Sequence, residues 1–356
     1  MHIRQLLDLA IAKNASDLHL VYGYPPALRI DSALDFIHGT NPLTDEDIVG
    51  LVLPLLYPAQ KRMFESTYEL DFAIPYQKKA RFRVNLFREQ GHVSAAFRLL
   101  PLVIPKLESL GLPVQVYPLS ELRQGFILVT GPTGHGKSTT LAAILNKINE
   151  TRPARIITIE DPIEYVFPQA RGLVSQREML VDTKSWSNAL RAALREDPDA
   201  VMVGEMRDYE TIAAAITIAE TGHLVFASLH TNSAAQAVDR IIDVFPEQQQ
   251  SQVRSQIAAT LEAVISQRLI PTLGPGRALA VELLMRTPAL ASMIRDGKTH
   301  LIDNLIQTSA EFGMIPMEAS LARLVQEGRV SIETAQNYCL HTDVLEKLVG
   351  GFHASI

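Results

Sequence analysis

Hydrophobic and polar residues alternate along two stretches ahead of residue 100. The alternation runs over residues 80–87 and returns over 93–98, with a short segment at 88–91 between them that ends in glycine. A period of two is typical of strands that bury one face, so the pattern predicts a β-hairpin. Three arginines fall on its polar face: Arg81, Arg83 and Arg98. A solvated surface explains them at least as well as a functional role does.

The same part of the chain also carries helical patterns. Apolar residues within 3–13 recur with helical spacing, and Thr44 and Asp47 have the spacing of a capping box ahead of a second helix. A short apolar run at 18–21 predicts a further strand. These elements predict a small α/β domain over residues 1–100.

Proline separates this domain from the rest of the chain. Four prolines lie within residues 101–118, which excludes a continuous helix or a central strand and predicts an interdomain linker. Beyond it, apolar runs alternate with helical patterns, which predicts an α/β domain with a largely parallel sheet over 119–356. One apolar stripe predicts a single helix that contains these positions: Val253, Ile257, Leu261, Val264 and Ile265. Residues 340–356 carry no motif and are compatible with a closing helix.

A glycine-rich loop follows one of these apolar runs. The run 126–129 leads into GPTGHGKST and then into an amphipathic helix, which is the context of a phosphate-binding P-loop, although a glycine-rich turn could fit by accident. Loop N–H groups and the helix N-terminus attract phosphate, Lys137 supplies charge, and the Ser138 hydroxyl is a ligand for Mg²⁺. The predicted ligands are therefore ATP and Mg²⁺. The predicted nucleotide-binding residues are Gly131, Pro132, Thr133, Gly134, His135, Gly136, Lys137, Ser138 and Thr139.

Three further apolar runs stop at titratable side chains. The runs and the residues that follow them are 155–159 with Glu160, 200–203 with Glu205, and 224–229 with His230. A buried sheet accepts such groups only at its edges, and parallel sheets bind ligands beyond the carboxyl ends of their strands. The coincidence therefore indicates a functional site at the edge that also holds the P-loop.

Nucleotide hydrolysis assigns roles to these residues. Glu205 fits the catalytic group that positions the attacking water, and Glu160 could orient water or the hydration shell of the metal. His230 could hydrogen-bond the γ-phosphate. Helix caps or surface pairs are the alternative interpretation of Glu160 and Glu205, and a structural role at the strand end is the alternative for His230. The source of positive charge for the transition state is less obvious from the sequence. The arginines of the predicted hairpin could supply it from a neighbouring subunit: Arg81, Arg83 and Arg98.

The composition limits the cell compartments and the classes of binding partner that fit this chain. The chain has 356 residues, of which 47% are hydrophobic and 20% charged, as expected of a folded protein with two domains. A formal net charge of −6 argues against nucleic-acid binding. The single cysteine, Cys339, excludes an internal disulfide and fits a reducing cytoplasm. No apolar run approaches the roughly 20 residues of a membrane span, so we expect no direct membrane insertion.

These motifs together resemble the secretion and type IV pilus ATPase family, and most of all its pilus retraction branch. The resemblance covers nearly the whole chain and is carried by ASDLHL at 15–20, RFRVN at 81–85, GPTGHGKSTT at 131–140, ITIEDPIEYVF at 157–167, REDPDAVMVGEMRDYET at 195–211, TGHLVFASLHTN at 221–232 and VISQRL at 264–269. In the family, similar segments form a Walker A motif, an Asp box with Glu160, a Walker B motif with the catalytic Glu205, and a His box with His230.

The resemblance implies both architecture and function. It implies a PAS-like first domain, a RecA-like second domain, and a homohexamer with ATP between the domains, where arginines of the first domain reach a nucleotide. It also implies a motor at the cytoplasmic face of the inner membrane, which acts on the pilus platform protein to retract the fibre in twitching motility. A pilus extension or type II secretion ATPase is the alternative within the family. A RecA-like nucleic-acid translocase is the alternative from another class.

Two positions depart from the family pattern. His135 stands where the P-loop of the family usually has serine, and we expect it to alter nucleotide affinity or its pH dependence. The segment 289–296 reads ALASMIRD where retraction ATPases usually read AIRNLIRE, so Ala291 replaces an arginine. This second change bears on coupling to the pilus and not on hydrolysis.

Overall fold

The computed structural model describes residues 2–30, 33–77 and 80–350. It divides into two compact units. The first unit comprises Met1–Ile104, Glu160–Val166 and Arg177–Ser185. The second unit comprises Pro105–Ile159, Phe167–Gln176 and Trp186–Ile356. No helix in the described part of the chain is both long and apolar enough to cross a membrane.

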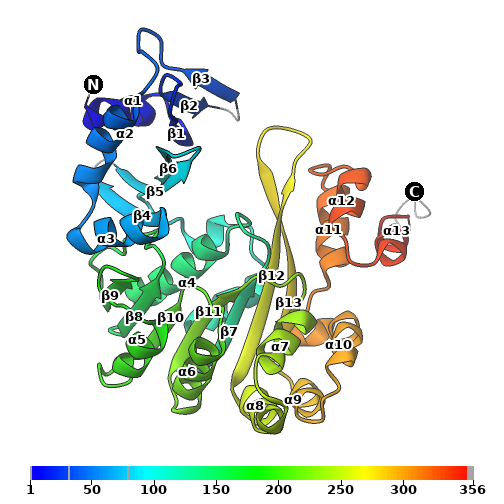
Figure 1. Cartoon of the computed structure of the whole chain (residues 1–356). Coiled ribbons are helices and arrows are strands. Elements are labelled where there is room, and N and C mark those ends of the chain that lie inside the picture. Colours follow the sequence, from blue (N-terminus) through cyan, green and yellow to red (C-terminus); the bar gives the residue numbers. More distant parts are fainter. Residues whose placement is uncertain (1, 31–32, 78–79, 351–356) are drawn as a thin grey trace. The chain divides into compact units, whose positions relative to one another are not determined.

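An antiparallel sheet forms the first unit (Figure 1), and its described strands follow the order β3-β2-β1-β6-β5-β4. The strands are β1 (Asp17–Leu20), β2 (Ala27–Ile30), β3 (Ala33–Phe36), β4 (Glu69–Tyr76), β5 (Ala80–Glu89) and β6 (His92–Leu100). The helices are α1 (Ile3–Ala12), α2 (Asp45–Val52) and α3 (Pro58–Thr67), with the 3₁₀ turn η1 (Leu53–Leu55). Helix and sheet side chains meet in one apolar core.

Local sequence chemistry explains much of this unit. Thr44 caps α2 by accepting from the Asp47 N–H, as the capping box predicted. The β5–β6 hairpin is also confirmed, and Gln90 and Gly91 form its turn with φ of 50° and 87°. A two-residue turn of this kind matches the twist of the strands that it joins. Strand β4 escaped the sequence analysis, although its buried and exposed residues alternate.

The second unit contains a mostly parallel sheet, and its described strands follow the order β13-β12-β7-β11-β10-β8-β9. The strands are β7 (Gly125–Thr130), β8 (Arg155–Glu160), β9 (Leu173–Glu178), β10 (Ala200–Val203), β11 (Leu224–Leu229), β12 (Leu261–Pro271) and β13 (Arg277–Met285). The pairs from β12 through β7, β11 and β10 to β8 are parallel, whereas β13 runs antiparallel to β12. The predicted α/β class with a largely parallel sheet is confirmed.

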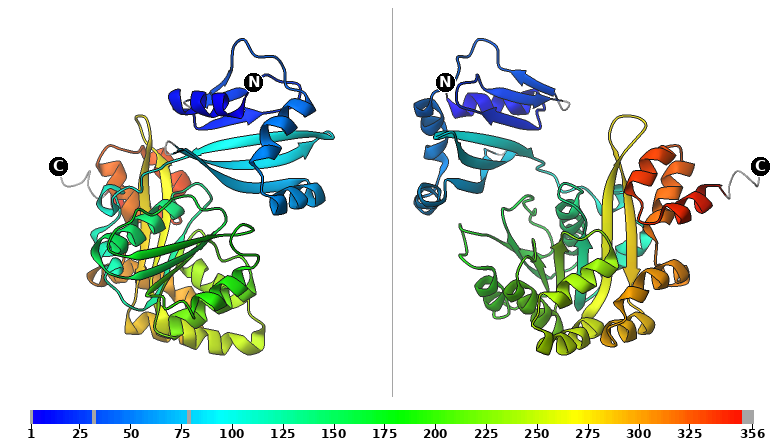
Figure 2. Two further views of the ribbon diagram at one scale, coloured as in Figure 1. Left: turned by 90° about the vertical axis from the view of Figure 1, so that its left-hand side faces the viewer. Right: turned by 45° about the vertical axis from the view of Figure 1, so that its right-hand side comes forward.

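Helices follow most strands of this sheet. They are α4 (Lys137–Thr151), α5 (Trp186–Ala193), α6 (Tyr209–Glu220), α7 (Ala234–Asp243), α8 (Glu247–Thr260), α9 (Pro288–Arg295), α10 (Ile302–Thr308), α11 (Met317–Gln326), α12 (Ile332–Tyr338) and α13 (Thr342–Gly350). Short 3₁₀ turns are η2 (Leu107–Ser109), η3 (Val114–Ser120), η4 (Thr299–Leu301) and η5 (Ala310–Phe312). Figure 2 shows the last three helices beside the β12–β13 hairpin, and a separate apolar cluster joins them to it.

One predicted element is wrong. Helix α8 ends at Thr260, and the residues from Leu261 onward form β12 instead of continuing the helix. Strand β12 lies between β7 and β13 and is buried on both faces, so it lacks the alternation that marks a half-buried strand. A continuous apolar run fits a helix and a buried strand equally well by spacing alone. The β-branched Val264 and Ile265 were the signal that favoured a strand.

The division into units differs in detail from the expected domains. Its first boundary, between Ile104 and Pro105, lies within the predicted linker 101–118. However, Glu160–Val166 and Arg177–Ser185 group with the first unit although the sequence analysis assigned them to 119–356. The Arg81 side chain explains part of this grouping, because it hydrogen-bonds a residue in each of the two segments.

Candidate functional site

Glycines shape the loop between β7 and α4. Gly131, Gly134 and Gly136 have φ of 139°, 79° and 84°, a region that L side chains rarely adopt. At Gly131 the space is also closed, because a Cβ atom would lie 2.3 Å from the carbonyl oxygen of Gln267. The loop therefore lies directly against β12, and only glycine fits at its first position.

The P-loop lysine is held at the start of this loop. Lys137 is the first residue of α4 and is 8% exposed. Its Nζ donates hydrogen bonds to the carbonyl oxygens of Gly131, at 2.8 Å, and Pro132, at 3.0 Å. A buried ammonium needs such acceptors, and phosphate oxygens are stronger ones.

His230 connects the loop to the predicted catalytic glutamate. Its Nε2 lies 3.1 Å from Glu205 Oε1, whereas its Nδ1 lies 3.3 Å from Thr133 Oγ1 and 3.5 Å from Lys137 Nζ. Because the lysine ammonium is a hydrogen-bond donor only, Nδ1 of His230 must be the acceptor. The ring proton is therefore on Nε2, which faces the Glu205 carboxylate. Burial, and then the charge of Lys137, lower the pKa of His230 although Glu205 raises it. The imidazole is therefore neutral at neutral pH.

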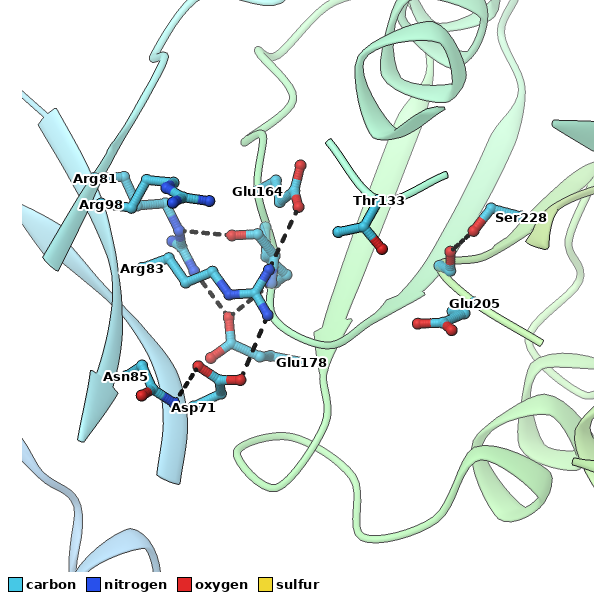
Figure 3. Close-up of polar contacts among 12 residues, drawn as sticks. Asp71, Arg81, Arg83, Asn85, Arg98, Thr133, Glu164, Glu178, Glu205 and Ser228 are labelled. Atoms are coloured by element: carbon cyan, nitrogen blue, oxygen red, sulfur yellow. Dashed lines mark hydrogen bonds and ion pairs between the residues drawn. The ribbon is translucent and has the colours of Figure 1, made fainter. Parts of the chain in front are cut away.

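Glu205 follows β10 and is ionised. Partial burial opposes its charge, but the hydrogen bond and charge of Arg207, together with the charge of Lys137, outweigh burial and hold the pKa of Glu205 below its ordinary value. Its Oε2 lies 2.7 Å from the Arg207 guanidinium. The backbone beside it is fixed by Ser228, whose hydroxyl donates to the Gly204 carbonyl (Figure 3). The site thus presents a carboxylate ready to accept a hydrogen bond.

Strands β12 and β13 donate hydrogen bonds to the P-loop, and the sequence analysis did not predict these contacts. Gln267 Nε2 donates to the His135 carbonyl at 2.6 Å, and the Leu269 N–H donates to His135 Nδ1 at 3.0 Å. Arg277 donates to the Gly134 carbonyl at 3.2 Å. The segment VISQRL contains Gln267 and Leu269, but it gave no role while β12 was interpreted as a helix.

The expected effect of His135 now has a structural basis. Burial, then the positive charges of Arg277, Lys137 and Arg268, lower the pKa of the His135 imidazole. The neutral ring is also what the geometry requires, since only an unprotonated Nδ1 can accept from the Leu269 N–H. His135 thus fastens the P-loop to β12.

Glu160 is the last residue of β8 and is 8% exposed. Strand β8 is parallel to β10, and Ile159 pairs with Val203, so both strands end at the same edge of the sheet. The Glu160 carbonyl accepts a hydrogen bond from the Met179 N–H. Its position at a strand end agrees with the sequence analysis, and its catalytic role stays a prediction.

The three arginines of the first unit have different surroundings (Figure 3). Arg83 and Arg98 are opposite each other in the β5–β6 register, which confirms the shared face. Arg98 pairs with Asp17, yet its side chain is 69% exposed. Arg81 is largely buried, with Nε bonded to the Ile163 carbonyl and Nη2 to Glu178.

Two further ion pairs involve Arg83, which lies 3.5 Å from Asp71 and 3.9 Å from Glu164. These contacts are partly exposed, so they hold the side chain weakly. The buried pairing of Arg81 indicates a structural role, because removal of one partner leaves an uncompensated buried charge. Arg83 and Arg98 are thus the two arginines that are better placed to bind something else.

Comparison with known proteins gives the family. The model for "Type II/IV secretion system protein" matches residues 70–337. The chain belongs to this family. The type IV pilus retraction ATPase PilT of Pseudomonas aeruginosa is 45% identical over 336 residues, which cover 94% of this chain and 97% of that protein. A twitching motility protein of Neisseria gonorrhoeae is 46% identical over 312 residues, 87% of this chain and 83% of that protein.

A solved structure extends this family likeness to the whole fold. The crystal structure of the pilus retraction motor PilT with bound ADP matches with a TM-score of 0.90 and 43% identity, over 98% of this chain and 99% of that one. The resemblance stated from the motifs is therefore confirmed. The α/β fold, with an amino-terminal domain ahead of the ATPase domain, is confirmed with it.

Proposed function

We propose that this chain is an ATP-hydrolysing motor that powers type IV pilus retraction. The observation that carries the proposal is the chain of contacts from the P-loop through His230 to Glu205. One imidazole joins the phosphate-binding element to the carboxylate, so both can respond to the same γ-phosphate. The likeness to PilT over nearly the full length of both chains supports retraction as the task that hydrolysis drives.

Phosphate binding follows from the loop. Its N–H groups and the N-terminus of α4 attract the phosphates, and Lys137 exchanges its loop carbonyls for phosphate oxygens. Ser138 is the second residue of α4 and is exposed, and its hydroxyl is the kind of oxygen ligand that Mg²⁺ takes. The residues therefore fit Mg²⁺, which when bound would neutralise charge on the phosphate oxygens.

Cleavage depends on the ordering of water. The ionised Glu205 accepts a hydrogen bond from the attacking water and aligns it with the γ-phosphate. Glu160, at the end of the neighbouring strand, would orient water or the hydration shell of a bound Mg²⁺. His230 donates from Nε2 to Glu205 and holds that carboxylate in place. Loss of the γ-phosphate removes a neighbour of Thr133 and Lys137. Because His230 contacts both of these residues and also Glu205, the position of Glu205 changes with it.

Assembly completes the proposal. A homohexamer gives each nucleotide access to arginines, and Arg83 and Arg98 are the proposed donors of positive charge because they share one sheet face. The assembly works in the cytoplasm, at the inner-membrane face of the pilus machine, against its platform protein. Opening and closing of subunits around the nucleotide would convert hydrolysis into movement.

Deletion of the gene tests this function. We expect mutant cells to carry excess surface pili and to lose twitching, and complementation with Glu205→Gln should fail to restore either. Bald cells would indicate an extension ATPase, and ATP hydrolysis stimulated by DNA or RNA would favour a nucleic-acid translocase. Normal pili with normal twitching would contradict any pilus role.

A further inference from the structure

A buried carboxyl group lies outside the site described above. Glu282 is on β13 and is 3% exposed. Its Oε1 accepts a hydrogen bond of 2.6 Å from the N–H of Ala234, the first residue of α7. Figure 1 shows α7 beside β12 and β13. A carboxylate at this end of a helix pairs with unsatisfied N–H groups and with the positive end of the helix dipole.

The start of α7 controls where His230 can lie. His230 follows β11, and only three residues separate it from Ala234. Asn232, within that connection, accepts hydrogen bonds from Ser266 and Arg268 of β12. The connection is thus held by β12 at its middle and by Glu282 at its far end.

Glu282 lies in a cluster of charged groups. Burial is the main reason that its pKa is raised to about 7, and Asp303 of α10 and Glu318 of α11 raise it further. The Ala234 N–H and Arg268 oppose this increase. Around Asp303 the other facing groups are His341 and Asp239. Glu282 therefore exchanges a proton close to neutral pH.

We propose that Glu282 is a positioning residue for hydrolysis: its ionised carboxylate fixes the start of α7, and thereby keeps His230 on Glu205, whereas the protonated group holds α7 more weakly. The inference rests on the proposed ATPase function. Strand β13 would thus fix the start of α7, a role that the P-loop, Glu205 and His230 do not have.

The direction of the effect follows from the charge. Above pH 7 the carboxylate is ionised and complements the helix N-terminus, so His230 is held and hydrolysis is fast. Below pH 7 the neutral acid still accepts a hydrogen bond, but its interaction with the helix dipole is lost. We expect kcat to fall by about threefold to tenfold across this step, and the ionisation of Glu282 to leave nucleotide affinity unchanged.

The test compares pH profiles of kcat in the full-length protein. Glu282→Gln keeps an acceptor for the Ala234 N–H but cannot ionise, so its kcat should stay near the acid level of the wild type and lose the step near pH 7. Glu282→Asp keeps the charge, and it should retain a step at reduced kcat. A fluorescent ATP analogue, used at each pH, checks that the wild type and Glu282→Gln have the same dissociation constant.

Glu318→Gln is the matched control. Glu318 is as buried as Glu282, but its Oε1 accepts from the N–H groups of Leu340 and His341 and not from the first residue of α7. Its variant should keep a step in kcat, moved to lower pH because the charge of Glu318 no longer raises the pKa of Glu282. A wild-type pH profile of kcat in Glu282→Gln would overturn the inference, and so would an equal loss of the step in Glu318→Gln. A flat pH profile of kcat in Glu282→Asp would also overturn it. This last measurement is possible even if Glu282→Gln does not fold. Unchanged turnover in Glu205→Gln would instead count against the proposed catalytic function and leave this comparison intact.

Discussion

Replacement of His135 tests whether β12 holds the P-loop. The neutral imidazole accepts a hydrogen bond from the Leu269 N–H, and Leu269 is half-buried. Such a bond contributes about 1 kcal/mol. If nucleotide binding needs the loop in this position, His135→Ala should weaken binding about fivefold. His135→Asn places an amide oxygen where Nδ1 lies, so it should retain most of the affinity.

The same contact gives a pH dependence with a definite sign. The pKa of His135 is lowered, so the folded protein favours the neutral ring. The contact is therefore complete above the ordinary histidine pKa of about 6.5 and is lost as the pH falls through the lowered value. Protonation also brings a positive charge toward Arg277 and Lys137, which adds repulsion to the lost bond.

Titration of a fluorescent ADP analogue between about pH 5.5 and 8 provides the assay. Phosphate groups of the ligand also titrate in this range, so variants are compared at each pH. Wild-type affinity should fall at acid pH relative to His135→Asn, whose profile should be flatter. His135→Ser, which carries the residue usual in the family, should lose the histidine-dependent part as well. Equal affinity and equal profiles in all variants would refute the role of this contact.

Three other predictions concern the loop, the arginines and the pilus. Gly131→Ala should abolish nucleotide binding, because the added Cβ would clash with the backbone of Gln267. Gly134→Ala, whose Cβ would have no atom within 4 Å, should cost only about 1 kcal/mol of backbone strain. Equal nucleotide affinity of the two variants would contradict the loop geometry. Arg83→Ala and Arg98→Ala should lower kcat at least about tenfold with intact folding, and wild-type rates in both would return this face to a structural role. Ala291→Arg, on the partly exposed face of α9, should leave hydrolysis unchanged and alter twitching; a change in kcat would argue against a coupling role.

Sequence patterns predict an element well when the pattern has one physical explanation. The β5–β6 hairpin has clear alternation and a turn that needs positive φ, and the structure agrees. The P-loop is equally specific, since glycine, lysine and serine at fixed spacing serve one chemistry. The run from Leu261 to Pro271 is ambiguous, because a strand buried on both faces gives the same apolar pattern as a helix.

The site was predictable residue by residue but not as a network. Glu205 and His230 were found because titratable groups after buried strands are rare. Their mutual contact, and the tautomer that it imposes on His230, depend on tertiary geometry. Gln267 and Glu282 gave no usable signal, since their roles depend on which strands and helices lie beside them.

The central claim is that this loop binds ATP and that Glu205 directs its cleavage. Its most direct test is to measure ATP binding and ATP turnover side by side in the wild type and in Glu205→Gln. We expect similar ATP binding in both proteins and a loss of turnover of at least about a hundredfold in the variant. Unchanged turnover in Glu205→Gln, or a wild-type protein that binds no ATP, would contradict it.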